Sequence, residues 1–252
     1  MMNENHTIRC EHLVSVDSTN SELKRRIAQG KLTSAYALSA DEQTAGRGRR
    51  GRNWFNTDGA VMFSVAFPLS GTESSRFPLV SAAAALGAMD ALHRYGVPAA
   101  IKWPNDLVTE HDGVLYKLSG ILSELAFDPN GRPYAIAGVG INANAAKPPT
   151  GLLQPATSIR IDTGTAVNTE EFRLYTVNAV FARLISVIEA PADLLCDYRE
   201  HLITLGRRVK AVWLDGRTAE GTALRIDDIG RLVIDTADGA ITVDAADVSV
   251  RS

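Results

Sequence analysis

The run Gln43-Thr-Ala-Gly-Arg-Gly-Arg-Arg-Gly-Arg-Asn-Trp54 is the most unusual stretch of this 252-residue chain. It holds three glycines, four arginines and no acidic residue. Glycine lets backbone N–H groups close on a ligand, and guanidinium groups bind phosphate or carboxylate through paired donors. Four like charges repel one another, and an anionic ligand would relieve that repulsion. The run therefore indicates an anion-binding loop, with a solvated basic loop or an RG-type nucleic-acid contact as the alternatives.

Two later segments carry side chains that suit the same chemistry. In Lys102-Trp-Pro-Asn-Asp-Leu107, the Trp-Pro step favours extended or turn backbone just before Asn105 and Asp106. The Asp106 carboxylate can pair with the basic loop, bind Mg²⁺ or accept a proton, and a plain Asx turn is the alternative. In Lys117-Leu-Ser-Gly-Ile-Leu122, a lysine precedes a strand glycine at which a ligand can approach the backbone. An edge-strand lysine is the alternative for that segment.

A fourth segment, Gly138-Val-Gly-Ile-Asn142, closes an expected strand. It lacks the GxGxxG spacing and a following helix, so it gives little support to a dinucleotide-binding fold. The five histidines show no zinc-binding spacing, and no GxSxG elbow or GxxxxGK[ST] loop occurs. If the protein uses ATP, we expect it to do so without a Walker loop.

The hydrophobic pattern predicts mixed helices and strands up to about residue 205. Thr19 is the expected N-cap of the first helix, with Glu22 at the capping-box spacing, and residues 145–168 are expected to form a surface loop. We expect helices at 18–30, 78–95, 169–189 and 191–204, and strands at 35–41, 60–67, 99–103, 106–109, 114–126 and 133–141. After Gly206 four or five short Val/Ile-rich strands follow, which is typical of a small β-barrel. The predicted fold class is α+β over 1–205 with a β domain over 206–252.

Composition excludes several classes of protein. The 26 Lys and Arg against 29 Asp and Glu give a net charge of −3, which argues against a globally basic nucleic-acid binder. With 45% hydrophobic and 22% charged residues, the chain is of ordinary globular composition. We find no apolar run long enough for a membrane helix and no secretory signal at the N-terminus. Cys10 and Cys196 are expected to be reduced thiols, and the expected location is cytoplasmic.

Taken together and in this order, the segments resemble the catalytic domain of the biotin–protein ligase family. The matching residues are Ser18-Thr19-Asn20, Gln43–Trp54, Lys102–Leu107, Lys117–Leu122 and Gly138–Asn142. The resemblance is dense over residues 14–145, and the part after Gly206 is similar to the family's SH3-like barrel in pattern only. It implies a mixed β-sheet domain packed with helices, and a two-step ligase. ATP and biotin would give biotinyl-5′-AMP and pyrophosphate, and a lysine of a biotin carboxyl carrier domain would then take the biotinyl group and release AMP.

The resemblance also implies roles for individual residues. Hydrogen bonds to the biotin ureido ring are expected from Ser18, Thr19 and Gln43. The full biotin set is Ser18, Thr19, Asn20, Gln43, Gly46, Arg47, Gly48, Arg49, Lys117, Gly120, Leu122, Gly138 and Gly140. The ATP set is Arg49, Arg52, Trp54, Asn105, Lys117 and Asn142, with Trp54 and Asn142 beside the adenine. The catalytic set is Arg47, Arg49, Lys117 and Asp106, where Asp106 orients or deprotonates the acceptor lysine or helps to hold Mg²⁺.

Partners and cofactors follow from the same resemblance. We expect biotin as substrate, ATP with Mg²⁺ as co-substrate and counter-ion, no fixed protein metal site and no tightly bound cofactor. About 17 residues precede Ser18, so we expect no N-terminal DNA-binding domain, no operator binding and no repressor activity. A homodimer is plausible, and no membrane partner is expected. The alternatives are a lipoate or octanoate ligase or transferase, a non-catalytic RNA-binding module, and a structural or partner-binding protein.

Two features of the segments lead to specific expectations. The link from Asp106 to Lys117 is longer than the family's usual hairpin, so a different strand pairing would displace Lys117. The glycine- and arginine-rich loop is expected to be mobile without ligand and to become ordered when biotin and ATP bind, with less proteolysis near Arg47–Arg52.

Overall fold

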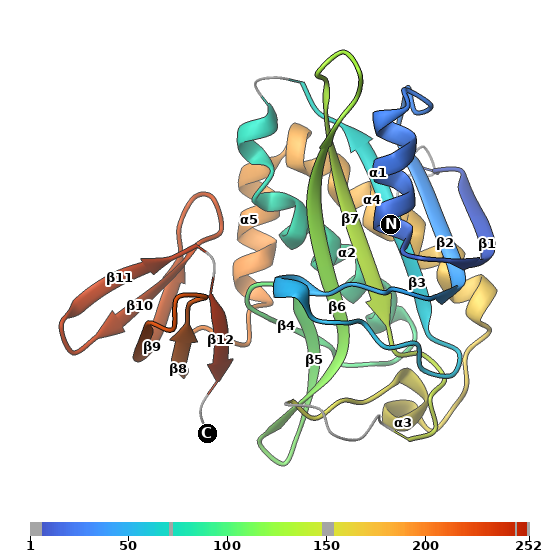
Figure 1. Ribbon diagram of the computed structural model, residues 1–252. Helices are drawn as coiled ribbons and strands as arrows, with labels where there is room; N and C mark the ends of the chain where they lie inside the picture. Colours follow the sequence, from blue (N-terminus) through green and yellow to red (C-terminus); the bar gives the residue numbers. More distant parts are fainter. Residues whose placement is uncertain (1–6, 71–72, 148–153, 245, 251–252) are drawn as a thin grey trace.

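The computed structural model describes residues 7–70, 73–147, 154–244 and 246–250. Its larger sheet has the strand order β1-β2-β3-β7-β6-β5-β4, with β1 parallel to β2 and every other neighbouring pair antiparallel (Figure 1). The strands are β1 (Cys10–Val16), β2 (Tyr36–Gln43), β3 (Val61–Pro68), β4 (Ala100–Lys102), β5 (Asp106–His111), β6 (Val114–Phe127) and β7 (Pro133–Ile141). The central strands β3 and β7 are almost wholly buried because helices cover both faces.

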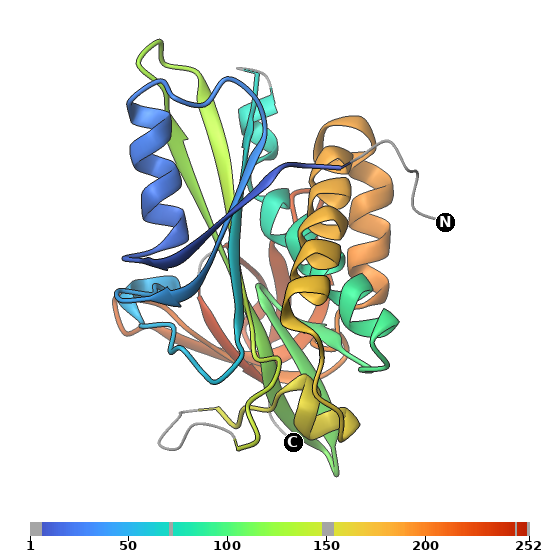
Figure 2. The same ribbon diagram turned by 90° about the vertical axis from the view of Figure 1, so that its right-hand side faces the viewer.

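Helix α1 (Thr19–Ala28) lies on one face of this sheet, and α2 (Leu79–Arg94), α4 (Thr169–Glu189) and α5 (Pro191–Glu200) lie on the other (Figure 2). The alanine-rich helix α2 is buried over most of its surface. A Cβ at Gly87 would lie 2.5 Å from the Val180 Cα, so glycine is what permits the close approach of α2 to α4. Shorter helical segments are η1 (Arg49–Gly51), η2 (Glu73–Arg76) and α3 (Ile159–Thr163).

The C-terminal strands form a second, antiparallel sheet of order β11-β10-β9-β8-β12. Its strands are β8 (Arg208–Val212), β9 (Thr218–Ile226), β10 (Leu232–Thr236), β11 (Gly239–Val243) and β12 (Asp247–Val250). The Val/Ile-rich strands expected after Gly206 are present and are joined by turns at Gly216, Gly230 and Gly239, each glycine with positive φ. The predicted α+β class with a small SH3-like β domain is confirmed, although the described residues leave the ladder open between β11 and β12. The boundary at residue 206 stays a prediction.

Three local expectations differ from the structure. Strand β1 was missed, because its alternation is weak at the edge of the sheet. The N-cap of α1 is Ser18, and the Thr19 hydroxyl instead contacts side chains of β2 and β3. Within the expected loop 145–168, the structure contains α3, and Ser158 is fully buried as its N-cap. Residues 148–153 of that loop lie outside the described residues.

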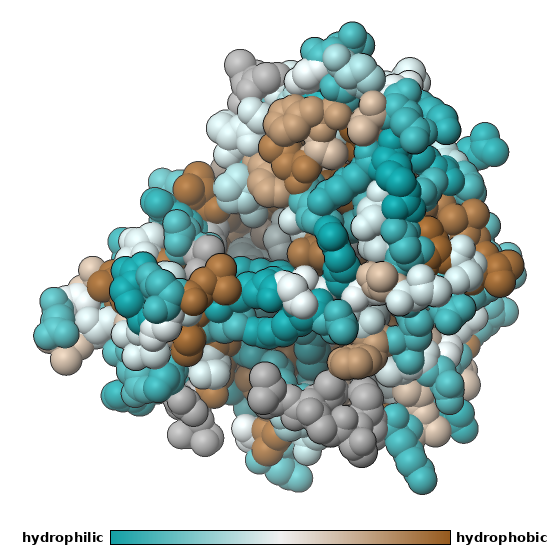
Figure 3. Space-filling view, in the orientation of Figure 1, coloured by the Kyte–Doolittle hydropathy of each residue, from teal (hydrophilic) through white to brown (hydrophobic). Residues whose placement is uncertain are grey.

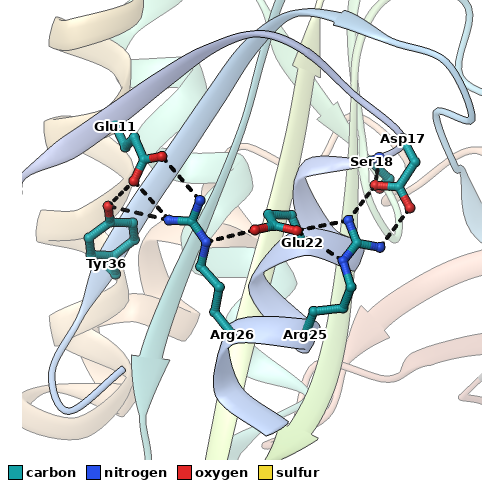
Figure 4. A network of polar contacts seen from close by, with 7 residues as sticks. All are labelled: Glu11, Asp17, Ser18, Glu22, Arg25, Arg26 and Tyr36. Atoms are coloured by element: carbon teal, nitrogen blue, oxygen red, sulfur yellow. Dashed lines mark hydrogen bonds and ion pairs between the residues drawn. The ribbon is translucent and has the colours of Figure 1, made fainter. Parts of the chain in front are cut away.

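A network of charged side chains ties α1 to the first two strands (Figure 4). Arg26 donates to Glu11 of β1 at 2.8 Å and to Glu22 at 2.8 Å, and the Tyr36 hydroxyl of β2 also donates to Glu11. These hydrogen bonds lower the pKa of Glu11 to about 2, with Arg26 as the largest cause. Since α1 begins at the residues expected to bind biotin, this network fixes their position relative to the sheet.

Replacing Arg26 by alanine should lower the melting temperature by about 2–4 °C at neutral pH, as expected for a partly exposed ion-pair network. The folded pKa of Glu11 lies below its unfolded value of 4.5, so its stabilisation is complete above that pH. It is lost as the pH falls from 4.5 towards 2. Thermal melts of both proteins should therefore converge at about pH 2.

The matched control is Arg217→Ala, which removes a surface pair with Asp215 only two residues away. That variant should melt within about 1 °C of the parent at neutral pH. A gap between the Arg26 variant and the parent that stays constant down to pH 2 would contradict the role of Glu11.

Candidate active site

A cavity of about 630 Å³ opens where the loop 44–56, the hairpin of β5 and β6, and strand β12 meet. Figure 1 shows this loop crossing in front of β6 and β7, and Figure 3 shows a hydrophilic band over the same part of the surface. The cavity wall contains residues from both sheets. It is therefore built from segments that lie far apart in the sequence.

Three glycines make the floor of the cavity. Gly120 of β6 pairs with Gly140 of β7, and Gly138 lies two residues along β7 on the same face. A Cβ at Gly140 would overlap the indole ring of Trp54, and one at Gly138 would lie 2.9 Å from the Asn20 Cγ. The glycines thus form a slot that the Asn20 amide and the Trp54 indole approach closely, and side chains at these positions would collide with both.

A buried polar cluster closes one end of this slot. The Thr19 N–H donates to Gln43 Oε1 at 2.9 Å, and the Thr19 and Ser64 hydroxyl oxygens lie 2.6 Å apart. The Ser64 hydroxyl donates to Asn20 Oδ1 at 2.5 Å, while the Asn20 amide donates to Glu124 at 2.8 Å. Ser64 and Glu124 were not predicted from the sequence. The cluster offers hydrogen-bond donors and acceptors together in a site that excludes most water.

The arginines of the loop each contact a polar partner. Arg47 donates to Glu124 at 2.9 Å and Arg49 donates to Asn105 Oδ1 at 3.0 Å. Arg50 and Arg52 both contact Asp247 of β12. Burial is the main cause of a lowered pKa for the Arg49 guanidinium.

Glu124 remains a carboxylate although it is half-buried. Burial alone would raise its pKa, but hydrogen bonds from Lys24 and Asn20 lower it below the ordinary value. The Lys24 ammonium lies 2.5 Å from Glu124 Oε1, the same oxygen that accepts from Arg47. Glu124 therefore links the loop to α1 through shared ionic hydrogen bonds.

Lys117 reaches Asp106, with 2.7 Å between the ammonium nitrogen and Oδ1. A bulge in the β5–β6 ladder leaves Leu118 between the pairs Leu107–Ser119 and Val108–Lys117. The longer hairpin ends in a tight turn at residues 112–113 and does not displace Lys117.

The main chain of Lys117 is fixed on its other side. Its N–H donates to the Pro155 carbonyl at 2.7 Å, and its carbonyl accepts from the Thr157 N–H at 2.9 Å. The ammonium nitrogen also lies 6.0 Å from the centre of the Trp54 ring. Lys117 is thus held at the border between the glycine floor and the cationic part of the cavity.

Most of the residues predicted for the site line this one cavity. They are Ser18, Thr19, Asn20, Gln43, Arg47, Gly48, Arg49, Arg52, Trp54, Asn105, Asp106, Lys117, Gly120, Leu122, Gly138 and Gly140. Gly46 and Asn142 lie outside the wall. Gly46 packs against the Trp54 main chain, and the buried Asn142 accepts a hydrogen bond from Thr57 at 3.3 Å.

The wall also contains residues that the sequence analysis did not single out. Lys102, which lies inside a recognised segment, donates to Gln154 Oε1 at 2.8 Å, and burial lowers the pKa of its ammonium group. Arg207, Val212 and Asp247 come from the C-terminal part, for which no motif was available. Of these, only Lys102 lies in a segment that the sequence made recognisable; Arg207, Val212 and Asp247 reach the wall through tertiary contacts.

The charge of the cavity wall favours an anionic ligand. Among the described residues, the cationic side chains that line it are Arg47, Arg49, Arg52, Lys102, Lys117 and Arg207, and the carboxylates are Asp106 and Asp247. No group of three potential metal ligands occurs among the described residues. The combination suits a ligand with an apolar body at the glycine floor and phosphate or carboxylate groups at the cationic end.

The indole N–H of Trp54 is a buried hydrogen-bond donor without a partner among the described residues. Buried donors in native proteins are nearly always paired, so an exception at a cavity wall points to an acceptor on a ligand.

Comparisons with known proteins agree with this chemistry. Residues 13–142 match the biotin/lipoate A/B protein ligase family, and residues 204–251 match the biotin protein ligase C terminal domain. The chain is 35% identical to the biotin–[acetyl-CoA-carboxylase] ligase of Mycobacterium tuberculosis, over 92% of this chain and 85% of that protein. It is 34% identical to the enzyme of the same name from Paracoccus denitrificans, over 94% and 98%.

A solved structure gives the same result at the level of the fold. The biotin protein ligase from Aquifex aeolicus, in complex with biotin and ATP, superposes with a TM-score of 0.76 at 28% identity. The match covers 96% of this chain and 98% of that one. The resemblance predicted from the sequence motifs is confirmed, and the lipoate alternative is not favoured. No described helix is long and apolar enough to cross a membrane.

Proposed function

Because this chain belongs to the biotin/lipoate A/B protein ligase family, we propose that it biotinylates a lysine of a biotin carboxyl carrier domain at the expense of ATP. In the first step an oxygen of the biotin carboxylate attacks the α-phosphorus of ATP. The α–β phosphoanhydride bond breaks, and pyrophosphate leaves with the bonding electrons. In the second step the lysine amine attacks the acyl carbon of biotinyl-5′-AMP, loses a proton and releases AMP.

The observation that carries this proposal is the continuity of the cavity. A glycine-floored slot with buried hydrogen-bonding groups leads into a wall of arginine and lysine. The ureido ring of biotin takes the end formed by Ser18, Thr19 and Gln43, with Asn20 beside it. The carboxyl end of biotin then lies near Lys117, where the phosphates of ATP also bind.

Catalysis must bring two anionic groups, the biotin carboxylate and the α-phosphate of ATP, into contact. A carboxylate and an α-phosphate repel each other, and Arg47, Arg49 and Lys117 are placed along the wall to offset that repulsion. The Arg52 side chain serves the phosphates, and Trp54 separates the two substrates, with its unpaired N–H available to either. Rate enhancement comes mainly from positioning and from fixed positive charge.

Mg²⁺ accompanies ATP in this proposal. Asp106 and Asn105 supply side-chain oxygen atoms at the wall, which suits an ion held mostly by substrate phosphates. When bound, the ion neutralises phosphate charge.

Biotin-dependent exchange of radiolabelled pyrophosphate into ATP tests the first step directly. We expect exchange with biotin, none without an acid, and little with lipoate. Exchange with lipoate instead of biotin would support the lipoate alternative. A folded protein that exchanges with neither acid, yet binds RNA with steep salt dependence, would support the RNA-binding module.

Asp106 is proposed to act in the second step. Its carboxylate lies 2.7 Å from the Lys117 ammonium at the cavity wall, which supports a position beside the entering acceptor amine. Asp106→Ala should slow transfer from preformed biotinyl-5′-AMP to a carrier domain by about 10²-fold, as for a lost general base. Single-turnover transfer measured across pH 6–9 is the test. Transfer at the parent rate would remove the base role and leave Asp106 as a positioning partner of Lys117.

Location and assembly complete the proposal. The reaction consumes ATP and the cysteines Cys10 and Cys196 are free, which fits a reducing, ATP-containing compartment such as the cytoplasm. A homodimer joined through the edge strand β1 of the large sheet fits the topology, because the outer edge of β4 is already hydrogen-bonded to residues 201–203. Light scattering at several protein concentrations tests the homodimer.

A further inference from the structure

Asp247 occupies an unusual place for a carboxylate. It begins β12 in the second sheet, where it pairs with Val212 of β8. Its side chain faces the loop and not its own sheet: the carboxylate contacts Arg52 and lies 3.2 Å from the Arg50 Nη1. The same Arg50 nitrogen donates to the Val212 carbonyl at 2.9 Å. The loop is thus fastened to the edge of the second sheet through two arginines.

The other acidic residues near the cavity are engaged elsewhere. Asp106 contacts Lys117, Glu124 contacts Arg47 and Lys24, and Glu110 contacts Arg207. Among the described residues of the cavity wall, this leaves Asp247 as the carboxylate that meets Arg52, the arginine expected to serve the phosphates. A negative charge at this position occupies donors that ATP would need.

We propose that Asp247 is a positioning residue that holds Arg52 in place before the nucleotide binds and yields it to the phosphates afterwards. Carboxylate and phosphate oxygens accept the same paired N–H donors of a guanidinium group. The triphosphate carries more negative charge than one carboxylate, so it is the stronger partner of the two. This inference rests on the proposed function, because it requires ATP as the incoming anion.

The solvent exposure of the Arg52–Asp247 ion pair supports an exchange of partners when ATP binds, and not a permanent ion pair. The side chains of Arg52 and Asp247 are 55% and 36% exposed, and ion pairs this open to water are weak. Release of Asp247 also removes one of the contacts between the loop and the second sheet, while the hydrogen bond from Arg50 to the Val212 carbonyl remains. Nucleotide binding and the position of the C-terminal sheet are therefore coupled through one carboxylate.

The test is Asp247→Asn, which removes the charge and keeps the size. In the pyrophosphate exchange assay we expect the KM for ATP to fall about two- to five-fold, with the KM for biotin unchanged. Without ligands, trypsin should cut faster after Arg50 and Arg52 than in the parent. With biotin and ATP, both proteins should be protected equally. A merely structural role would alter stability and leave the KM for ATP unchanged.

Asp228→Asn is the matched control, because Asp228 is fully exposed on the C-terminal part and pairs with Arg199 at 3.5 Å. It makes the same change in charge and should leave both KM values as in the parent. Asp247→Glu should restore the parent KM for ATP. Asp247→Ser serves as a second neutral variant if the asparagine variant does not fold.

An unchanged or higher KM for ATP in the neutral variants would overturn the role of Asp247. Absence of biotin-dependent exchange in the parent would instead overturn the proposed function. The two failures are therefore distinguishable in one assay.

Discussion

Replacing Lys117 by alanine is expected to lower the kcat of biotin-dependent pyrophosphate exchange about 10²- to 10³-fold. Its ammonium group lies 2.7 Å from Asp106 and beside the glycine floor, where the biotin carboxylate and the α-phosphate must meet. Without the Lys117 ammonium group, the biotin carboxylate and the α-phosphate lose the nearest positive charge that offsets their repulsion. The loss should appear mainly in kcat, because the carboxylate and the α-phosphate come into bonding distance only in the transition state, where their repulsion is greatest.

Two further variants separate this effect from a loss of folding or of charge in general. Lys31→Ala removes an exposed lysine remote from the cavity and should leave exchange unchanged. Lys117→Arg keeps the charge but not the compact ammonium, and should retain an intermediate rate. Thermal melting checks that each variant is folded. Exchange by Lys117→Ala within about threefold of the parent would exclude Lys117 from the adenylation step.

Local sequence signals predicted the parts of the site that lie on continuous segments. The loop 43–54, the strand glycines and Lys117 are recognisable because each needs particular residue types next to one another. The short strands of the second sheet were equally predictable from their Val and Ile content, and the glycines at their turns have the positive φ that favours glycine. These signals also sufficed for the α+β class, because the period of the hydrophobic residues changes after residue 206.

Contacts between distant segments could not be predicted in this way. Glu124 joins α1 to the loop, and Asp247 joins the loop to the second sheet, yet each stands alone in its local sequence. The Thr19 hydroxyl was assigned to a helix cap because the capping spacing is a local pattern, whereas its partners lie on β2 and β3. Similarly, Ser158 is buried by contacts that the Pro-, Thr- and Gly-rich composition of its segment conceals.

Gly140 gives the second large effect that we expect. A valine at this position should raise the KM for biotin about 10- to 100-fold, because its side chain would enter the slot and meet the Trp54 indole. The backbone at Gly140 cannot easily shift to relieve this overlap, since Gly140 pairs with Gly120 on one side and with Met62 on the other. Gly140→Ala should show a smaller rise in the same direction, which makes the pair of variants a graded probe of slot depth.

The pattern across substrates distinguishes a blocked slot from a damaged sheet. Because the phosphates bind at the other end of the cavity but the displaced Trp54 indole also borders the nucleotide, the KM for ATP measured at saturating biotin should rise less than the KM for biotin in both variants. Ser123→Ala is the control on the neighbouring strand: its hydroxyl is buried without a partner among the described residues, so its removal should leave both KM values unchanged. Equal rises in both KM values for Gly140→Val, with a lowered melting temperature, would show that Gly140 serves the fold and not the biotin slot. A rise mainly in the KM for biotin would locate the apolar body of the substrate on the glycine floor, and with it the end of the cavity from which the carboxylate must approach Lys117.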